Sequence, residues 1–136
     1  MTQELIEAYI SGLPDVEQAE NFGYRFFFVG ADHRLPFATI ASSDNDFDRV
    51  SHLDRDGVYR VNIGVSKETF DQLVDNSHTK EPDYTELNVF LPHPDYAKQH
   101  FVCILNPTGD RLQRTKELIA EAHAIAAKRM QRKTKD

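Results

Sequence analysis

The chain has 136 residues, a formal net charge of −6 at pH 7 and 40% hydrophobic residues, which fits one domain with one core. It contains a single cysteine, so an internal disulfide framework and a cysteine-rich zinc site are excluded. No apolar run approaches the length of a membrane span, and the acidic start MTQELIEAY lacks the features of a signal peptide. We therefore expect a cytoplasmic protein with one α+β domain, residues 1–136.

The charge is unevenly distributed along the chain. Residues 1–127 carry 11 basic and 21 acidic side chains, whereas residues 128–136 carry five basic side chains and one acidic. The acidic body argues against a nucleic-acid surface over most of the fold. We predict that residues 128–136 form a basic tail that frays into solvent.

The first part of the chain predicts a helix and then an antiparallel meander. The helix is expected from Thr2 to Gly12, because apolar residues recur on one face and glycine is a typical helix end. Turns that contain Gly23 and Gly30 then separate three alternating or apolar segments. The predicted strands are residues 16–20, 24–29 and 36–41.

The stretch 57–70 predicts a buried strand that leads directly into a capped helix. One face of the strand is apolar and β-branched, and the opposite face carries Arg60 and Asn62. Ser66 stands at the N-cap position, and capping explains it better than nucleophilic catalysis, because GVSKE does not make G-x-S-x-G. Asn76 is the predicted helix end. The residues of the apolar face are Val61, Ile63 and Val65.

The remaining elements are a polar loop over residues 42–56, held to the core by Val50 and Leu53, and a second polar loop over residues 77–84. Residues 85–91 fit either a helical turn or a strand, and Pro92-His93-Pro94 is expected to prevent regular structure. A short helical turn, a strand and a long final helix complete the chain. They are predicted at residues 95–99, residues 100–105 and from residues 106–108 onward.

This order of elements predicts an α+β fold. Helices alternate with strands that are apolar on one side and mixed on the other, and the first three strands form a meander. We expect an antiparallel sheet of about five strands with the helices packed on it.

Two sets of reactive side chains are interpreted as ordinary structure. Asp44, Asp46 and Asp48 resemble the start of an EF-hand loop, but the sixth position is Arg49 and the twelfth is Arg55, so an acidic, solvated loop is expected. The single cysteine, Cys103, lies in the apolar run FVCIL and is predicted to be a small buried side chain without reactivity. No metal site and no cofactor are predicted.

The candidate ligand-binding residues are two histidines and their neighbours. His93, Tyr96 and His100 gather around the proline-rich turn, where two imidazoles and a phenol can converge. The spacing of the histidines is not that of metal ligands on one helical turn. Arg60 and Asn62 join this set if the turn closes over their face of the sheet; a structural salt bridge is the alternative role for Arg60.

Several segments resemble a bacterial family of unknown function and, more distantly, the YjbR/MmcQ-like domains. They are AENFGYRFFFV, PFATIA, GVYRVNIGVSKETFDQL and PHPDYAKQHFVCILNP, followed by the long final helix, so the resemblance covers nearly the whole chain. It implies a YjbR-like α+β fold with a curved antiparallel sheet backed by helices. Phe101 stands where the distant group often has Trp. The resemblance implies no catalytic residues.

Three functional hypotheses follow from these observations. The first is a non-enzymatic domain that binds a small molecule or a protein, with a pocket lined by Arg60, Asn62, His93, Tyr96 and His100. The second is a small-molecule enzyme that uses His93 or His100 as an acid or base. The third is weak nucleic-acid binding through the basic tail. A monomer and a homodimer formed through an exposed sheet edge are both compatible with the sequence.

Overall fold

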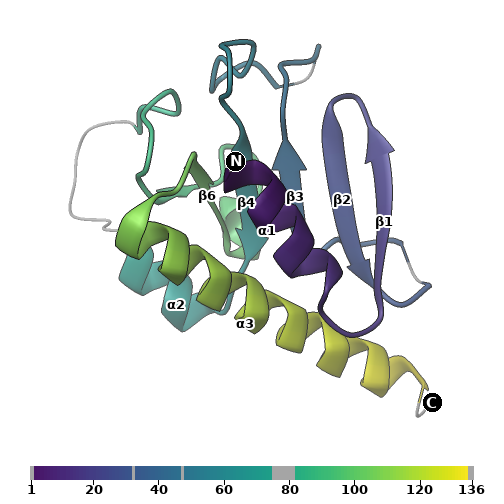
Figure 1. The fold of residues 1–136 in the computed structure, drawn as a ribbon. Coiled ribbons are helices and arrows are strands. Elements are labelled where there is room, and N and C mark those ends of the chain that lie inside the picture. The colour runs from purple at the N-terminus through teal and green to yellow at the C-terminus, as the bar shows by residue number, and fades with distance from the viewer. Residues whose placement is uncertain (1, 32, 47, 75–81, 135–136) are drawn as a thin grey trace.

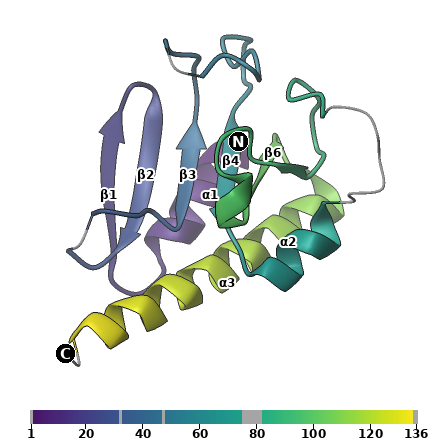
Figure 2. The ribbon, with the colours of Figure 1, turned by 180° about the vertical axis from the view of Figure 1, so that it is seen from behind.

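In the computed structural model, which describes residues 2–31, 33–46, 48–74 and 82–134, a six-stranded sheet carries three α-helices on one face (Figures 1 and 2). The strand order is β1-β2-β3-β4-β6-β5, with neighbouring strands antiparallel. The predicted α+β fold is confirmed, with six strands instead of about five. The elements are α1 (Thr2–Ser11), β1 (Val16–Asn21), β2 (Tyr24–Val29), β3 (Ala38–Ala41), β4 (Arg60–Gly64), α2 (Lys67–Leu73), β5 (Leu91–Pro92), the 3₁₀ turn η1 (Ala97–Gln99), β6 (Phe101–Leu105) and α3 (Gly109–Thr134).

The helix-covered face of the sheet forms the main core. Side chains alternate along each strand, so Phe27, Ile40, Val61 and Ile104 all point toward the helices. The helices supply the other half of this core from α1, α2 and α3, and the predicted apolar face of β4 is fully used here. The helix residues are Ile6, Ile10, Phe70, Leu118, Ile119, Ala122 and Ala126.

The sixth strand corrects the expectation that Pro92-His93-Pro94 prevents regular structure. Leu91 and Pro92 pair with Cys103 and Val102 of β6. Proline is tolerated because β5 is an edge strand, where one side of the backbone needs no partner strand. Cys103 is fully buried, as predicted, and burial raises its pKa to about 12, which disfavours the thiolate form.

The start of α2 agrees with the sequence. The Ser66 hydroxyl accepts a hydrogen bond from the Thr69 amide at 3.1 Å, which is the predicted N-cap. Glu121 of α3 accepts from the Ser66 amide and from the Thr69 hydroxyl, both at 2.9 Å, so one carboxylate joins the two helices. The helix ends at Leu73, and the predicted end at Asn76 lies outside the described residues.

The basic C-terminal segment differs from the prediction of a frayed tail. Helix α3 continues to Thr134, so the described part of residues 128–136 is helical. Met130 still packs against the core, and positive side chains near a helix C-terminus interact favourably with the helix dipole. In the part of the chain that the structure describes, no helix is long and apolar enough to cross a bilayer.

The long loop after β3 folds back over the second face of the sheet. Leu53 is buried against Ala41 and Leu105, as predicted. Val50, which was also predicted to hold the loop to the core, is exposed instead. The Asp44 carboxylate accepts from the Leu53 amide at 2.8 Å, which stabilises this return. The loop thereby brings Asp48 next to Arg60 of β4.

Candidate functional site

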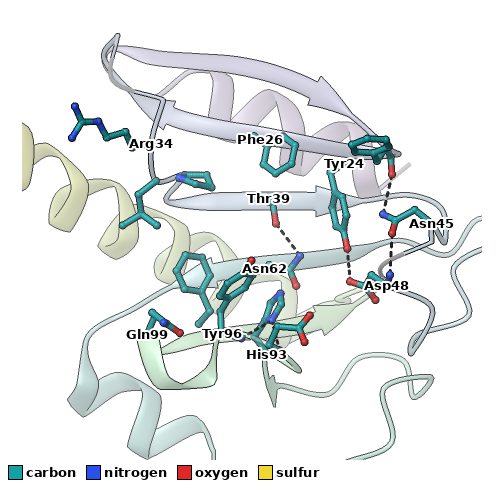
Figure 3. Close-up of a pocket in the computed structure, with 15 residues that line it drawn as sticks. Tyr24, Phe26, Arg34, Thr39, Asn45, Asp48, Asn62, His93, Tyr96 and Gln99 are labelled. Carbon is teal, nitrogen blue, oxygen red and sulfur yellow. Dashed lines mark hydrogen bonds between the residues drawn. The ribbon is translucent and has the colours of Figure 1, made fainter.

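A pocket of about 530 Å³ lies on the face of the sheet opposite the helices. Its floor is made by β2, β3 and β4, and its sides are residues 34–36, the start of the long loop and the segment from His93 to Phe101 (Figure 3). Figure 2 shows this side of the sheet, with α1 behind the strands. A volume of this size is typical of small-molecule sites.

The walls of the pocket are mainly aromatic. Tyr24 and Phe26 come from alternate positions of β2, with ring centroids 5.8 Å apart. Tyr96 and Phe101 approach from the other side, with centroids 6.3 Å apart. Leu35, at the rim, adds apolar surface. Flat apolar walls of this kind favour a planar, apolar ligand.

Gly64 allows Phe101 to lie over β4. A Cβ atom at position 64 would lie 2.9 Å from two ring carbons of Phe101, well inside the usual contact distance. The aromatic wall therefore depends on the absence of a side chain at this point of the strand.

We expect Gly64→Ala to displace the Phe101 ring and to lower the free energy of unfolding by about 1–3 kcal/mol, because the added methyl overpacks the contact. Urea denaturation followed by circular dichroism measures the stability, and ring-current shifts in NMR spectra report the ring. Gly12→Ala is the control, since a Cβ there meets only ordinary contacts of 3.5 Å or more. Equal effects of the two substitutions would contradict the role of Gly64.

A buried ion pair adjoins the pocket on the same face of the sheet. Arg60 is fully buried, and its guanidinium binds both carboxylate oxygens of Asp48, the Ser51 hydroxyl at 2.9 Å and Asn62 Oδ1 at 3.0 Å. Tyr24 donates its hydroxyl hydrogen to Asp48. Every polar group that the guanidinium touches is thus part of one hydrogen-bond network, which is the condition for burying such charges.

The network keeps both members of the pair charged. Burial by itself would raise the pKa of Asp48, but hydrogen bonds from Arg60 and Tyr24 outweigh it and the pKa is lowered. Burial likewise opposes the charge of Arg60, and the bonds to Asp48 raise its pKa above the ordinary value. For Tyr24, burial and the bond to Asp48 both raise the pKa, so its hydroxyl stays neutral.

His93 forms the end of the floor and is almost fully buried, with 6% of its surface exposed. Its Nδ1 atom accepts hydrogen bonds from the amides of Asp95 and Tyr96 at 3.0 and 3.1 Å. Burial, together with the Arg60 guanidinium, lowers the pKa of His93 to about 4. The ring is therefore neutral at pH 7 and serves as the acceptor that holds the turn before η1.

The five predicted ligand residues are only partly brought together. Asn62, His93 and Tyr96 line the pocket, whereas Arg60 is outside the lining and hydrogen-bonds to Asn62. His100 does not belong to the lining: its ring lies against Phe70 of α2, with centroids 5.7 Å apart. A left-handed backbone conformation, φ 65°, ends η1 at this residue.

Several lining residues were missed in the sequence. Tyr24 and Phe26 alternate with the core residue Phe27, so their face was predictable, but that face had no assigned role. Thr39 lies opposite Asn62 in the β3–β4 register, a pairing that alternation alone does not specify. Asp48 was interpreted as part of a solvated loop and instead is buried as the partner of Arg60.

Comparison with known proteins gives a family and no function. The family model described as "Family of unknown function (DUF6194)" matches residues 1–135. No curated protein matches the chain significantly. No solved structure does either.

Proposed function

Because the chain belongs to the DUF6194 family, whose function is unknown, we propose a function from the pocket itself: the protein binds a small, largely apolar molecule on the open face of its sheet. The observation that carries this proposal is an aromatic-walled cavity of about 530 Å³ above a floor of buried polar side chains. Apolar walls with a few fixed polar groups are the usual composition of such sites.

The proposed role is binding without catalysis. Acid–base chemistry by the two histidines is less well supported, because His93 lines the pocket and His100 packs against Phe70 instead. His93, with its pKa lowered to about 4 and its Nδ1 atom occupied by two amides, is also a weak base at neutral pH. A cytoplasmic location and a distant relation to the YjbR/MmcQ-like domains remain predictions from the sequence.

The bicyclic hydrocarbon indane is a suitable probe for this function. We expect indane to shift the amide NMR signals of Thr39, Asn62 and Phe101, which lie around the pocket, and not those of α1. Tyr96→Ala should weaken indane binding several-fold, because it removes one aromatic wall from a side chain that is 55% exposed and contributes little to the core.

The matched control is Leu5→Ala, which removes an apolar side chain of similar exposure, 59%, from α1. It should leave indane binding unchanged. Shifts scattered over the whole surface, or equal losses in both variants, would show that the pocket is not the binding site.

A further inference from the structure

The tautomer of His93 is determined by its contacts. Backbone amides can only donate, so the two hydrogen bonds at Nδ1 require a lone pair on that atom. In the neutral ring the proton must then sit on Nε2. The ring therefore presents an N–H donor at the edge that faces away from the turn.

This donor has no protein acceptor within the described residues. Both hydrogen bonds of the His93 side chain to described residues are made by Nδ1, and the residue is 6% exposed and lines the pocket. Figure 3 places the ring beside the side chain of Asn62, at the inner end of the cavity. Because His93 lines the pocket, this donor is free to bind an acceptor on a ligand there.

The polar side chains next to His93 also leave a hydrogen-bond donor available to the pocket. Asn62 Oδ1 accepts from Arg60 Nε at 3.0 Å, and Asn62 Nδ2 donates to Thr39 Oγ1 at 2.9 Å. With its oxygen already accepting, the Thr39 hydroxyl keeps its hydrogen available for the pocket. The inner end of the cavity thus offers donors from two nearly buried side chains, Thr39 and His93.

The charges around the pocket are balanced. Arg60 and Asp48 neutralise one another, and Tyr24 already donates to the same carboxylate. The lining residues that carry charge at the rim, Arg34 and Asp95, have opposite signs. Neither an anionic nor a cationic ligand finds a dedicated counter-charge at the inner end.

We propose, building on the binding function above, that the pocket selects a neutral, planar ring compound whose carbonyl-type oxygen accepts a hydrogen bond from His93 Nε2, with the Thr39 hydroxyl as a second donor. The ring system lies between the aromatic walls formed by Phe26, Tyr96 and Phe101. Aromatic ketones, lactones and lactams are the chemical classes that fit this arrangement.

The test compares three probes of similar shape: 1-indanone, which carries a carbonyl, indane, which lacks it, and indane-1-carboxylate, which is anionic. We expect 1-indanone to bind about fivefold more tightly than indane, the contribution of one neutral hydrogen bond. The Nε2–H signal of His93 in imidazole-selective NMR spectra should shift with 1-indanone and not with indane. The carboxylate should bind no better than indane.

Two substitutions of His93 distinguish its proposed role as a donor to the ligand from its role as the acceptor that holds the turn. His93→Asn places an oxygen near the position of Nδ1, so it keeps the acceptor for the Asp95 and Tyr96 amides and loses the Nε2 donor. It should abolish the preference for 1-indanone over indane, and the readout is the ratio of the two affinities within each variant. His93→Gln restores an N–H near Nε2 and should retain the preference.

The outcomes distinguish the two proposals. Equal binding of 1-indanone and indane in the pocket would overturn the acceptor inference and leave the binding function standing. Preferred binding of the carboxylate would overturn the inference of a neutral ligand. If no probe perturbs the pocket residues, both the inference and the proposed function fail.

Discussion

Replacing Arg60 with Met is expected to lower the free energy of unfolding by about 3–5 kcal/mol at pH 7. This is the typical cost of removing one partner of a buried ion pair and leaving the other charge unpaired. Arg60 is fully buried and Asp48 is 8% exposed, so the substitution leaves a carboxylate without its cation in a site that water hardly reaches. Asn62 and Ser51 lose donors at the same time. Because the stability of a whole domain is about 5–15 kcal/mol, unfolding of part of the sample is expected.

The control for this effect is the double variant Arg60→Met/Asp48→Asn. It removes the orphaned charge and keeps an oxygen that can accept from Tyr24, so it should be more stable than Arg60→Met alone. Urea denaturation followed by circular dichroism measures all three proteins; tryptophan fluorescence cannot be used, because the chain has no Trp. A loss below about 1 kcal/mol in the single variant, or no recovery in the double variant, would show that the pair does not support the fold.

Acidification from pH 7 to pH 4.5 is expected to remove about 2 kcal/mol of stability through His93 alone. Its pKa in the folded protein is about 4, below the ordinary value of 6.5. Between these values the unfolded chain binds a proton that the folded protein excludes, so stability falls as the pH falls. Above pH 6.5 the contribution is complete, and below about pH 4 the loss levels off because both states are protonated.

The variant His93→Asn isolates this contribution from other groups that titrate in acid. Asn cannot take up the proton, so the difference in stability between pH 7 and pH 4.5 should be about 2 kcal/mol smaller than in the original protein. His93→Gln should show the same reduced pH dependence with lower stability throughout, since it does not supply the acceptor for the Asp95 and Tyr96 amides. An unchanged pH dependence in both variants would mean that protonation of His93 is not coupled to folding.

The groups that face His93 explain why its neutral form is preferred. Burial disfavours the charged form of the ring, the positive charge of Arg60 disfavours a second positive charge, and the negative charge of Asp48 opposes this effect only in part. Tyr96 and Phe101 pack against the ring, with centroids 4.9 and 6.3 Å away, and exclude water. Asp95 contacts it through its backbone amide. The charge state of His93 in the pocket is thus linked to the Arg60–Asp48 ion pair.

Local structure was predictable from the sequence wherever neighbours in the chain decide it. Ser66 followed by Thr69 makes a helix cap within one turn, and the alternation of Val61 with Asn62 assigns the two faces of β4 without any knowledge of the partner strands. The helix, meander and final helix were recognised for the same reason. The end of α3 was not, because contact of Met130 with the core extends it.

The site depended on contacts between segments far apart in the chain. Arg60 and Asn62 were recognised as polar residues that need partners, but the partner Asp48 is supplied by a loop whose path is determined by burial of Leu53. His93 and His100 looked equivalent in sequence, and yet the left-handed backbone at His100 directs the two rings to different surroundings.

By itself, then, the sequence of this protein determined the helices, most of the strands and which face of each strand is apolar, because side-chain periodicity and caps act over a few residues. Only the tertiary structure decided that Arg60 on the polar face of β4 is neutralised by Asp48, and that His93 and Asn62 line one pocket. Those outcomes depend on the register of the strands and on the path of the loop after β3. Both are selected by the free energy of burial between segments far apart in the chain, which no short segment of sequence reveals.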